Sequence, residues 1–121
     1  MARVIHFELG VDDVQRAIDF YSRTFGWKIE KWDGPTEYWL VSTGDAQEPG
    51  IDGAIFPRQG GMVWNNVLGV ENLDEALQKL VINGGKVLEG KMTIPGVGYF
   101  AQVTDTEGNG FCLMQDDAGA K

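Results

Sequence analysis

The sequence predicts an α+β protein made of two tandem β-α-β-β-β modules that share one domain. Residues 9–29 align without a gap with residues 68–88, so the chain repeats itself after 59 positions. Both aligned segments run from a short apolar stretch into a helical pattern. Three short apolar segments, separated by turn residues, follow each helix. We place the modules at residues 1–57 and 62–121 and a linker at 58–61.

The first module opens with a strand, "VIHFELGV", at residues 4–11. Asp12 or Asp13 then offers a side chain that can cap the start of a helix. Gly26 is suited to end this helix because the last position often needs a positive φ. Strands are expected at 27–32, 37–43 and 50–56. The apolar positions with helical spacing are Val14, Ala17, Ile18, Tyr21 and Phe25.

The second module repeats this order. Asn72 stands at the expected helix start, and Glu75 follows three residues later, a spacing close to a capping box. Gly84 and Gly85 mark the end of the helix. Strands are expected at 85–91, 98–104 and 109–115. The apolar positions with helical spacing are Leu73, Ala76, Leu77, Leu80 and Val81.

Composition excludes several classes of protein. The chain has 121 residues, of which 43% are hydrophobic, and this is enough for one packed core. Its net charge is -8 and its basic residues are scattered, so we expect no nucleic-acid partner. No apolar run is long enough to span a bilayer, so we expect no membrane partner. Cys112 is the only cysteine, which excludes an intrachain disulfide and fits the cytoplasm.

Two stretches carry a resemblance to a known family. "HFELGVDDVQRAIDFYSRTFGW" and "GYFAQVTDTEGNGFCLMQ" resemble the vicinal oxygen chelate superfamily, which includes glyoxalase I, extradiol dioxygenases and bleomycin-resistance proteins. "YWLVSTG", "PGIDG", "GGKV" and "IPGVGYFAQVTDTEGN" are similar to its uncharacterised glyoxalase-like branch. The resemblance implies that the modules form a half-open sheet enclosing a cavity, and it also implies a homodimer.

The resemblance implies that metal-binding members take ligands from the first and last strands of each module, and it places the first ligand at His6. The repeat then gives Asn65 as the counterpart of His6, and the last-strand positions fall on Cys112 and, within one residue, Ile55. Asp52 is the only carboxylate nearby, and the loose alignment there leaves open whether it approaches the site. An amide is a weak ligand and Ile cannot coordinate. We therefore expect a degenerate site without a catalytic metal, in which any divalent ion would use His6 and Cys112.

His6 and Glu8 are candidates for chemistry that needs no metal. Side chains alternate across a strand, so His6 and Glu8 share the face opposite Phe7 and Leu9. A carboxylate beside an imidazole can act with it as general base and acid. Residues two apart on a strand are separated by about 7 Å, so the two side chains need not touch.

Aromatic residues are expected to line the cavity. The modules place Tyr38-Trp39 and Tyr99-Phe100 at matching positions, so one ring of each pair should face the helix and the other the cavity. Such walls with a few polar groups suit a flat or amphiphilic small molecule. The alternative is that these rings belong to the core or a subunit interface. The predicted ligand-binding residues are Tyr38, Leu40, Ile55, Trp64, Asn65, Tyr99 and Cys112.

Three functions follow from these patterns. The leading hypothesis is a glyoxalase-like protein that binds a small organic molecule, with or without metal-independent acid–base chemistry at His6 and Glu8. The first alternative is a divalent-metal-dependent lyase or isomerase of the glyoxalase I type. The second alternative is a resistance protein that sequesters a drug. Fold alone does not identify the ligand, because one architecture carries many functions.

Overall fold

The computed structural model describes residues 2–58, 60 and 63–121. The described residues form eight strands and two helices, which confirms the predicted α+β class. Contacts divide the chain into two compact units. The first unit is His6–Asn65, and the second combines the N-terminal residues through Ile5 with Asn66–Lys121. Part of the predicted linker 58–61 lies outside the described residues, so the linker stays a prediction.

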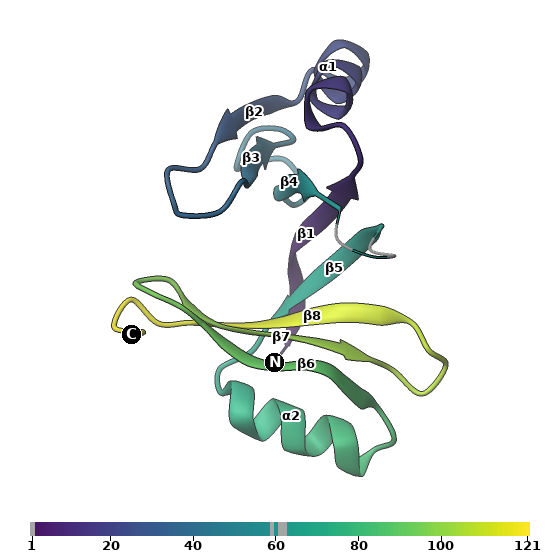
Figure 1. Ribbon diagram of the computed structural model, residues 1–121, viewed down its shortest axis with the longest axis vertical. Helices are drawn as coiled ribbons and strands as arrows, with labels where there is room; N and C mark the ends of the chain where they lie inside the picture. Colours follow the sequence, from purple (N-terminus) through teal and green to yellow (C-terminus); the bar gives the residue numbers. More distant parts are fainter. Residues whose placement is uncertain (1, 59, 61–62) are drawn as a thin grey trace. The chain divides into compact units, whose positions relative to one another are not determined.

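The first unit is a four-stranded sheet with one helix on one face (Figure 1). β1 (Arg3–Val11) runs parallel to β4 (Gly53–Pro57), while β3 (Trp39–Ser42) is antiparallel to β4 and to β2 (Lys28–Lys31). The helix α1 (Val14–Phe25) covers a core whose buried members are Phe7, Leu9, Val41 and Ile55. The opposite face of the sheet therefore carries the other side chains of β1, including those of His6 and Glu8.

The ends of α1 follow the sequence pattern. Asp13 is the N-cap, since its carboxylate accepts a hydrogen bond from the Arg16 N–H at 3.0 Å. Gly26 ends the helix with φ of 75° and donates its N–H to the Ser22 carbonyl at 2.9 Å. A side chain at this φ would be strained, which explains the glycine. Of the two candidate caps, Asp13 is thus the one used.

The second unit repeats this arrangement with its own core. β8 (Gly110–Asp116) runs parallel to β5 (Trp64–Gly69) and antiparallel to β7 (Gly98–Thr104), which pairs with β6 (Lys86–Ile94). Figure 1 shows α2 (Leu73–Ile82) lying along one face of these strands. The core beneath α2 has Leu73, Ala101, Val103 and Leu113 as its buried members. A separate buried cluster of Val67, Phe100 and Cys112 occupies the other face.

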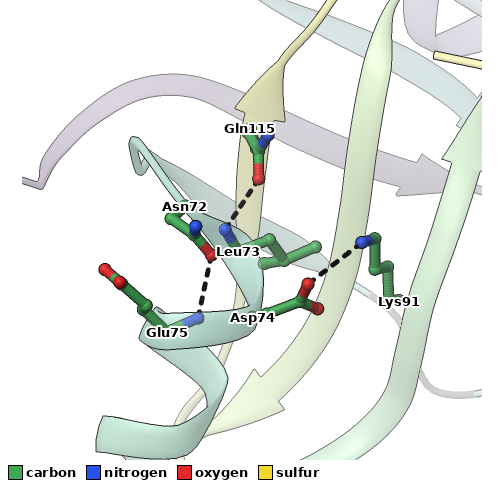
Figure 2. Close-up of polar contacts among 6 residues, drawn as sticks. All are labelled: Asn72, Leu73, Asp74, Glu75, Lys91 and Gln115. Carbon is green, nitrogen blue, oxygen red and sulfur yellow. Dashed lines mark hydrogen bonds and ion pairs between the residues drawn. The ribbon is translucent and has the colours of Figure 1, made fainter.

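The start of α2 is tied to the sheet of the second unit (Figure 2). Asn72 caps the helix by accepting the Glu75 N–H at 3.0 Å. The Gln115 side chain reaches from β8 and accepts the Leu73 N–H at 2.8 Å. Lys91 forms an ion pair with Asp74 at 3.2 Å. Because the first N–H groups of a helix have no intrahelical partner, these bonds fix where α2 begins.

Replacing Gln115 with Met is expected to lower the free energy of unfolding by about 1–3 kcal/mol. The new side chain has similar size, but it leaves the N–H of the fully buried Leu73 without its side-chain acceptor. Urea unfolding followed by circular dichroism measures the change. Lys91→Met is the matched control, because it removes an exposed ion pair that contributes little. Equal losses in the two variants would contradict the proposed role of Gln115.

Neither helix in the described part of the chain has the length and apolar character needed to cross a bilayer.

Candidate functional site

Three polar side chains meet on the face of the first unit's sheet opposite α1. Tyr38, immediately before β3, donates its hydroxyl hydrogen to Glu8 Oε2 at 2.7 Å. His6 Nε2 lies 3.1 Å from the same hydroxyl oxygen. His6 and Glu8 therefore need not touch each other directly, because Tyr38 joins them. We call these three residues the Tyr38 triad.

The ring of Tyr38 is held from two sides. It stacks on Phe56, with ring centroids 6.2 Å apart, and its other neighbour is Trp32, whose ring lies edge-on at 5.8 Å. The Tyr38 carbonyl also accepts the Trp32 N–H at 2.8 Å. Rings and backbone together fix where the hydroxyl points, so the triad does not depend on a mobile side chain.

Glu8 is the buried charged residue of the triad. Only 8% of its surface is exposed. Burial raises the pKa of the Glu8 carboxyl above its usual value, and the hydrogen bond from Tyr38 lowers this pKa by a smaller amount. A carboxylate with raised pKa is a better proton acceptor than an exposed one. The environment of Glu8 is thus suited to a general base.

His6 is shifted in the opposite direction. Burial lowers the pKa of the imidazole, while the negative charge of Asp52 raises it by a smaller amount. Asp52 is held in place because its Oδ1 accepts the Thr43 N–H at 2.9 Å. The sequence left open whether Asp52 approaches the site, and the structure shows that its charge acts on His6. Neutral imidazole is therefore favoured in the triad.

The chain also matches a known protein family. The family model described as Glyoxalase/Bleomycin resistance protein/Dioxygenase superfamily matches residues 3–113. The chain belongs to this superfamily. This confirms the family resemblance of the sequence and the fold class.

The chain is similar in sequence or in fold to individual known proteins. It is 32% identical to a glyoxylase-like domain-containing protein of Didymella fabae, over 84% of each chain. It is 30% identical to a lactoylglutathione lyase of Escherichia coli O157:H7, over 97% of this chain and 96% of that one. A Streptomyces coelicolor methylmalonyl-CoA epimerase variant in complex with 2-nitronate-propionyl-CoA shares the fold, with a TM-score of 0.69 and 15% identity, over 98% and 97% of the chains. The epimerase in that structure holds a coenzyme A ester.

The residues at the superfamily's metal-ligand positions do not fit a metal site. Within the described ranges, no group of three or more His, Cys, Asp or Glu side chains is arranged to hold a metal ion. His6 Nε2 is engaged with Tyr38, and its repeat counterpart is the amide of Asn65. Cys112 belongs to the second unit, where it is 1% exposed in an apolar cluster with Val67 and Phe100.

Strand register places two predicted ligand-binding residues of the first unit on opposite faces of its sheet. Glu8 pairs with Ala54, and Ala54 pairs with Leu40, so Leu40 shares the face of the Tyr38 triad and is 43% exposed. Ile55 instead pairs with Leu9 and lies fully buried in the core beneath α1. The prediction that Ile55 lines the ligand site was wrong. Its neighbour Ala54 lies beside Glu8, and alternation along β4 points the Ile55 side chain to the other face.

Trp64 belongs to the aromatic group packed against α1. Its ring lies 5.3 Å from that of Phe7 and also contacts Tyr21 and Trp27, although 49% of its surface is exposed. These ring contacts agree with the core alternative that the sequence left open, and a role of Trp64 in ligand binding stays a prediction. Asn65 follows on β5 with a half-buried side chain, and its role in binding stays a prediction.

Tyr99 also lies on the opposite face from the one expected. It packs with the core beneath α2, and Lys91 Nζ lies 4.4 Å from its ring centre. Phe100, its neighbour, is the ring that faces away from α2. The pair alternates as predicted, but the repeat does not conserve which member faces the helix, so the assignment of Tyr99 as a ligand-binding residue is corrected. Cys112 shares the face of Phe100, as the strand register requires.

Sequence reasoning missed the central role of Tyr38. It placed Tyr38 among the cavity residues but did not connect it with His6 and Glu8, which lie 30 or more positions earlier. The available signal was the alternation that put Tyr38 and Glu8 on the open face of one sheet. The order of strands decides whether two such residues meet, and alternation alone does not give that order.

Proposed function

We propose that this chain binds a small organic molecule and catalyses proton transfer on it without a metal, with Glu8 as the base. The observation that carries the proposal is the Tyr38 hydroxyl, which joins Glu8 to His6 by bonds of 2.7 and 3.1 Å. Burial of the two side chains also supports the proposal, because it raises the pKa of Glu8 and lowers the pKa of His6. A catalytic acid–base pair is more effective when both pKa values approach the working pH.

The substrate class that we propose is an acyl thioester. The names of the relatives supply two candidates, lactoylglutathione and methylmalonyl-CoA. Both are thioesters, and in both the carbon next to the carbonyl carries a hydrogen. A thioester carbonyl stabilises the charge that remains when this hydrogen leaves as a proton. A buried carboxylate such as Glu8 is chemically suited to accept that proton.

The chain's own residues would then divide the work. The Glu8 carboxylate takes the proton from the carbon, and the electron pair of the C–H bond moves into the carbonyl to give an enolate. Return of a proton to the same carbon restores the thioester. The ring of Phe56 and the exposed Leu40 supply the apolar wall beside the base. Exchange of the hydrogen with solvent is the simplest reaction that this set can perform.

Removal of metals is expected to leave this exchange intact. Protein treated with EDTA, and prepared without a histidine tag, should exchange the α-hydrogen of lactoylglutathione or methylmalonyl-CoA in D2O at the rate of the untreated protein. Proton NMR follows the loss of the α-hydrogen signal, and elemental analysis checks that metals are below one ion per chain.

Loss of exchange with EDTA and its return with a divalent ion would instead support the metal-dependent lyase or isomerase. Tight binding of a thioester or a drug-like aromatic compound with no exchange at all would support the sequestering protein.

We also propose that the protein is a cytoplasmic homodimer. The cytoplasmic location rests on the single cysteine, and the dimer rests on the superfamily resemblance. Size-exclusion chromatography with light scattering tests the dimer. A mass of one 13.3 kDa chain at all concentrations would rule it out.

A further inference from the structure

We propose that Tyr38 is a proton relay that connects the buried base Glu8 to His6. This inference rests on the proposed function only for its role in turnover, since the relay itself is a property of three side chains in the first unit. Tyr38 acts through Glu8 and not on the substrate, so it is a positioning and relay residue.

The Tyr38 hydroxyl has a single hydrogen, and this limits how its contacts with Glu8 and His6 can be made. A hydroxyl carries one hydrogen, and here it donates that hydrogen to Glu8 Oε2. The 3.1 Å contact with His6 must then be made by a hydrogen on Nε2, which donates to the Tyr38 oxygen. In the reverse arrangement, a protonated Glu8 donates to the Tyr38 oxygen and Tyr38 donates to a bare Nε2.

In the first arrangement Nε2 already holds a hydrogen, so it accepts none from Tyr38 until His6 changes to the tautomer with hydrogen on Nδ1. After Glu8 accepts a substrate proton, His6 exchanges hydrogens with solvent, releasing the one on Nε2 and gaining one on Nδ1, and the second arrangement forms. The Glu8 O–H hydrogen then passes to the Tyr38 oxygen while the Tyr38 hydrogen passes to His6 Nε2. Glu8 becomes a carboxylate again, Tyr38 ends as a neutral phenol, and His6 becomes an imidazolium. The imidazolium then gives its Nδ1 hydrogen to solvent, which restores the first arrangement. No ionised tyrosine remains at the end, and no other reactant is needed.

Burial explains why Glu8 needs such a path. The Glu8 residue is 8% exposed, whereas His6 is only half-buried. A buried carboxylic acid exchanges its proton with water slowly unless a chain of hydrogen bonds leads outward. The two pKa shifts are opposite in sign and bring the two values closer together, because burial raises the pKa of Glu8 and lowers the pKa of His6. Similar pKa values let a proton move between the two groups in either direction.

The surroundings of Tyr38 support a fixed relay and not a chance contact. Phe56 stacks on one side of its ring, Trp32 meets it edge-on, and the backbone bond from Trp32 holds the residue in place. Asp52 adds a negative charge that acts on His6 and stabilises the imidazolium formed at the end of the transfer. Each component of the relay therefore has a structural support.

The test uses the single histidine of the chain. With 15N-labelled histidine, NMR reports the two ring nitrogens of His6 and no others. In the full-length protein above the pKa of both groups, we expect the tautomer with hydrogen on Nε2 to predominate. At lower pH, the His6 curve should show a second inflection when Glu8 takes up its proton. Tyr38→Phe should abolish the second inflection and bring the tautomer ratio toward that of free histidine.

Two further variants sharpen the result. Glu8→Gln should also remove the second inflection, because its side chain does not titrate. Tyr21→Phe is the matched control, since it removes a phenol hydroxyl from the aromatic group under α1 and leaves the triad intact. An unchanged tautomer ratio and inflection in folded Tyr38→Phe protein would overturn the relay. Near-ultraviolet circular dichroism confirms that each variant is folded.

Turnover separates the relay from the proposed function. If both hold, Tyr38→Phe lowers thioester exchange by roughly 100-fold, and added imidazole buffer restores part of the rate. If Tyr38→Phe exchanges at the wild-type rate, the relay is wrong and proton transfer by Glu8 stands. If wild-type protein exchanges neither thioester but the NMR coupling is present, the relay stands and the proposed function is wrong.

Discussion

Glu8→Gln protein is expected to lose thioester exchange and to become more stable at neutral pH. The amide keeps an oxygen that accepts the Tyr38 hydroxyl hydrogen, but it cannot take a proton from carbon. Loss of a general base lowers rates by roughly 100- to 10,000-fold. The same change removes a charge that is buried in the folded protein. We expect the free energy of unfolding at pH 7 to rise by about 1 kcal/mol or more.

The dependence on pH follows from the raised pKa of Glu8. A carboxyl with a higher pKa in the folded state binds its proton more tightly there than in the unfolded chain. Its contribution to stability is therefore fully present below the unfolded value, at about pH 4, and is lost as the pH rises through the folded pKa. Wild-type and Glu8→Gln proteins should match near pH 4 and diverge as the pH increases.

Urea unfolding at pH 4, 5, 6 and 7 measures this difference. Glu30→Gln is the matched control, because Glu30 lies in β2, opposite Leu40 in the same row of strand pairs, and is exposed. Its removal should change stability by less than about 0.5 kcal/mol at every pH. Lower stability of Glu8→Gln at pH 7 would show that the ionised carboxylate stabilises the fold, and the role of burial would then be wrong.

Much of the fold could be predicted because the information is local. The caps Asp13 and Asn72 and the glycine at position 26 stand next to the helices they bound, so their chemistry is visible in the sequence. The repeat also predicts two tandem modules. Alternation places His6 and Glu8 on the face opposite Phe7 and Leu9 without any structure.

The candidate site was predicted less completely because it depends on register. Tyr38 meets Glu8 because β3 lies beside β4, and β4 beside β1, in the order that the structure shows. Ile55 was assigned by comparing glycines at Gly53 and Gly110, and an error of one residue on a strand reverses the face. The assignment of Tyr99 to the cavity was also wrong because a position was matched to the wrong face of its strand. Its equivalence to Tyr38 in the repeat hides the fact that the two rings point to opposite sides of their sheets.

Ile55→Ala is expected to lower the free energy of unfolding by about 2–5 kcal/mol, a large share of the stability of a domain this size. Ile55 is fully buried and packs with Phe7, Leu9 and Val41 beneath α1, so removal of its side chain leaves a cavity. Ligand affinity of the protein that remains folded should change little, because the side chain points away from the Tyr38 triad. Thermal unfolding and calorimetric titration with a thioester measure the two effects.

Leu40→Ala is the control that separates packing from binding. Leu40 lies on β3 in the row that includes Glu8 and is 43% exposed, so its truncation should cost less than about 1 kcal/mol of stability. It should weaken thioester binding instead, since it removes apolar surface beside the base. The opposite outcome, with Ile55→Ala stable but defective in binding, would mean that β4 is out of register by one residue. A one-residue shift in β4 would also move Ala54 from beside Glu8, so the two variants test the register on which the whole site depends.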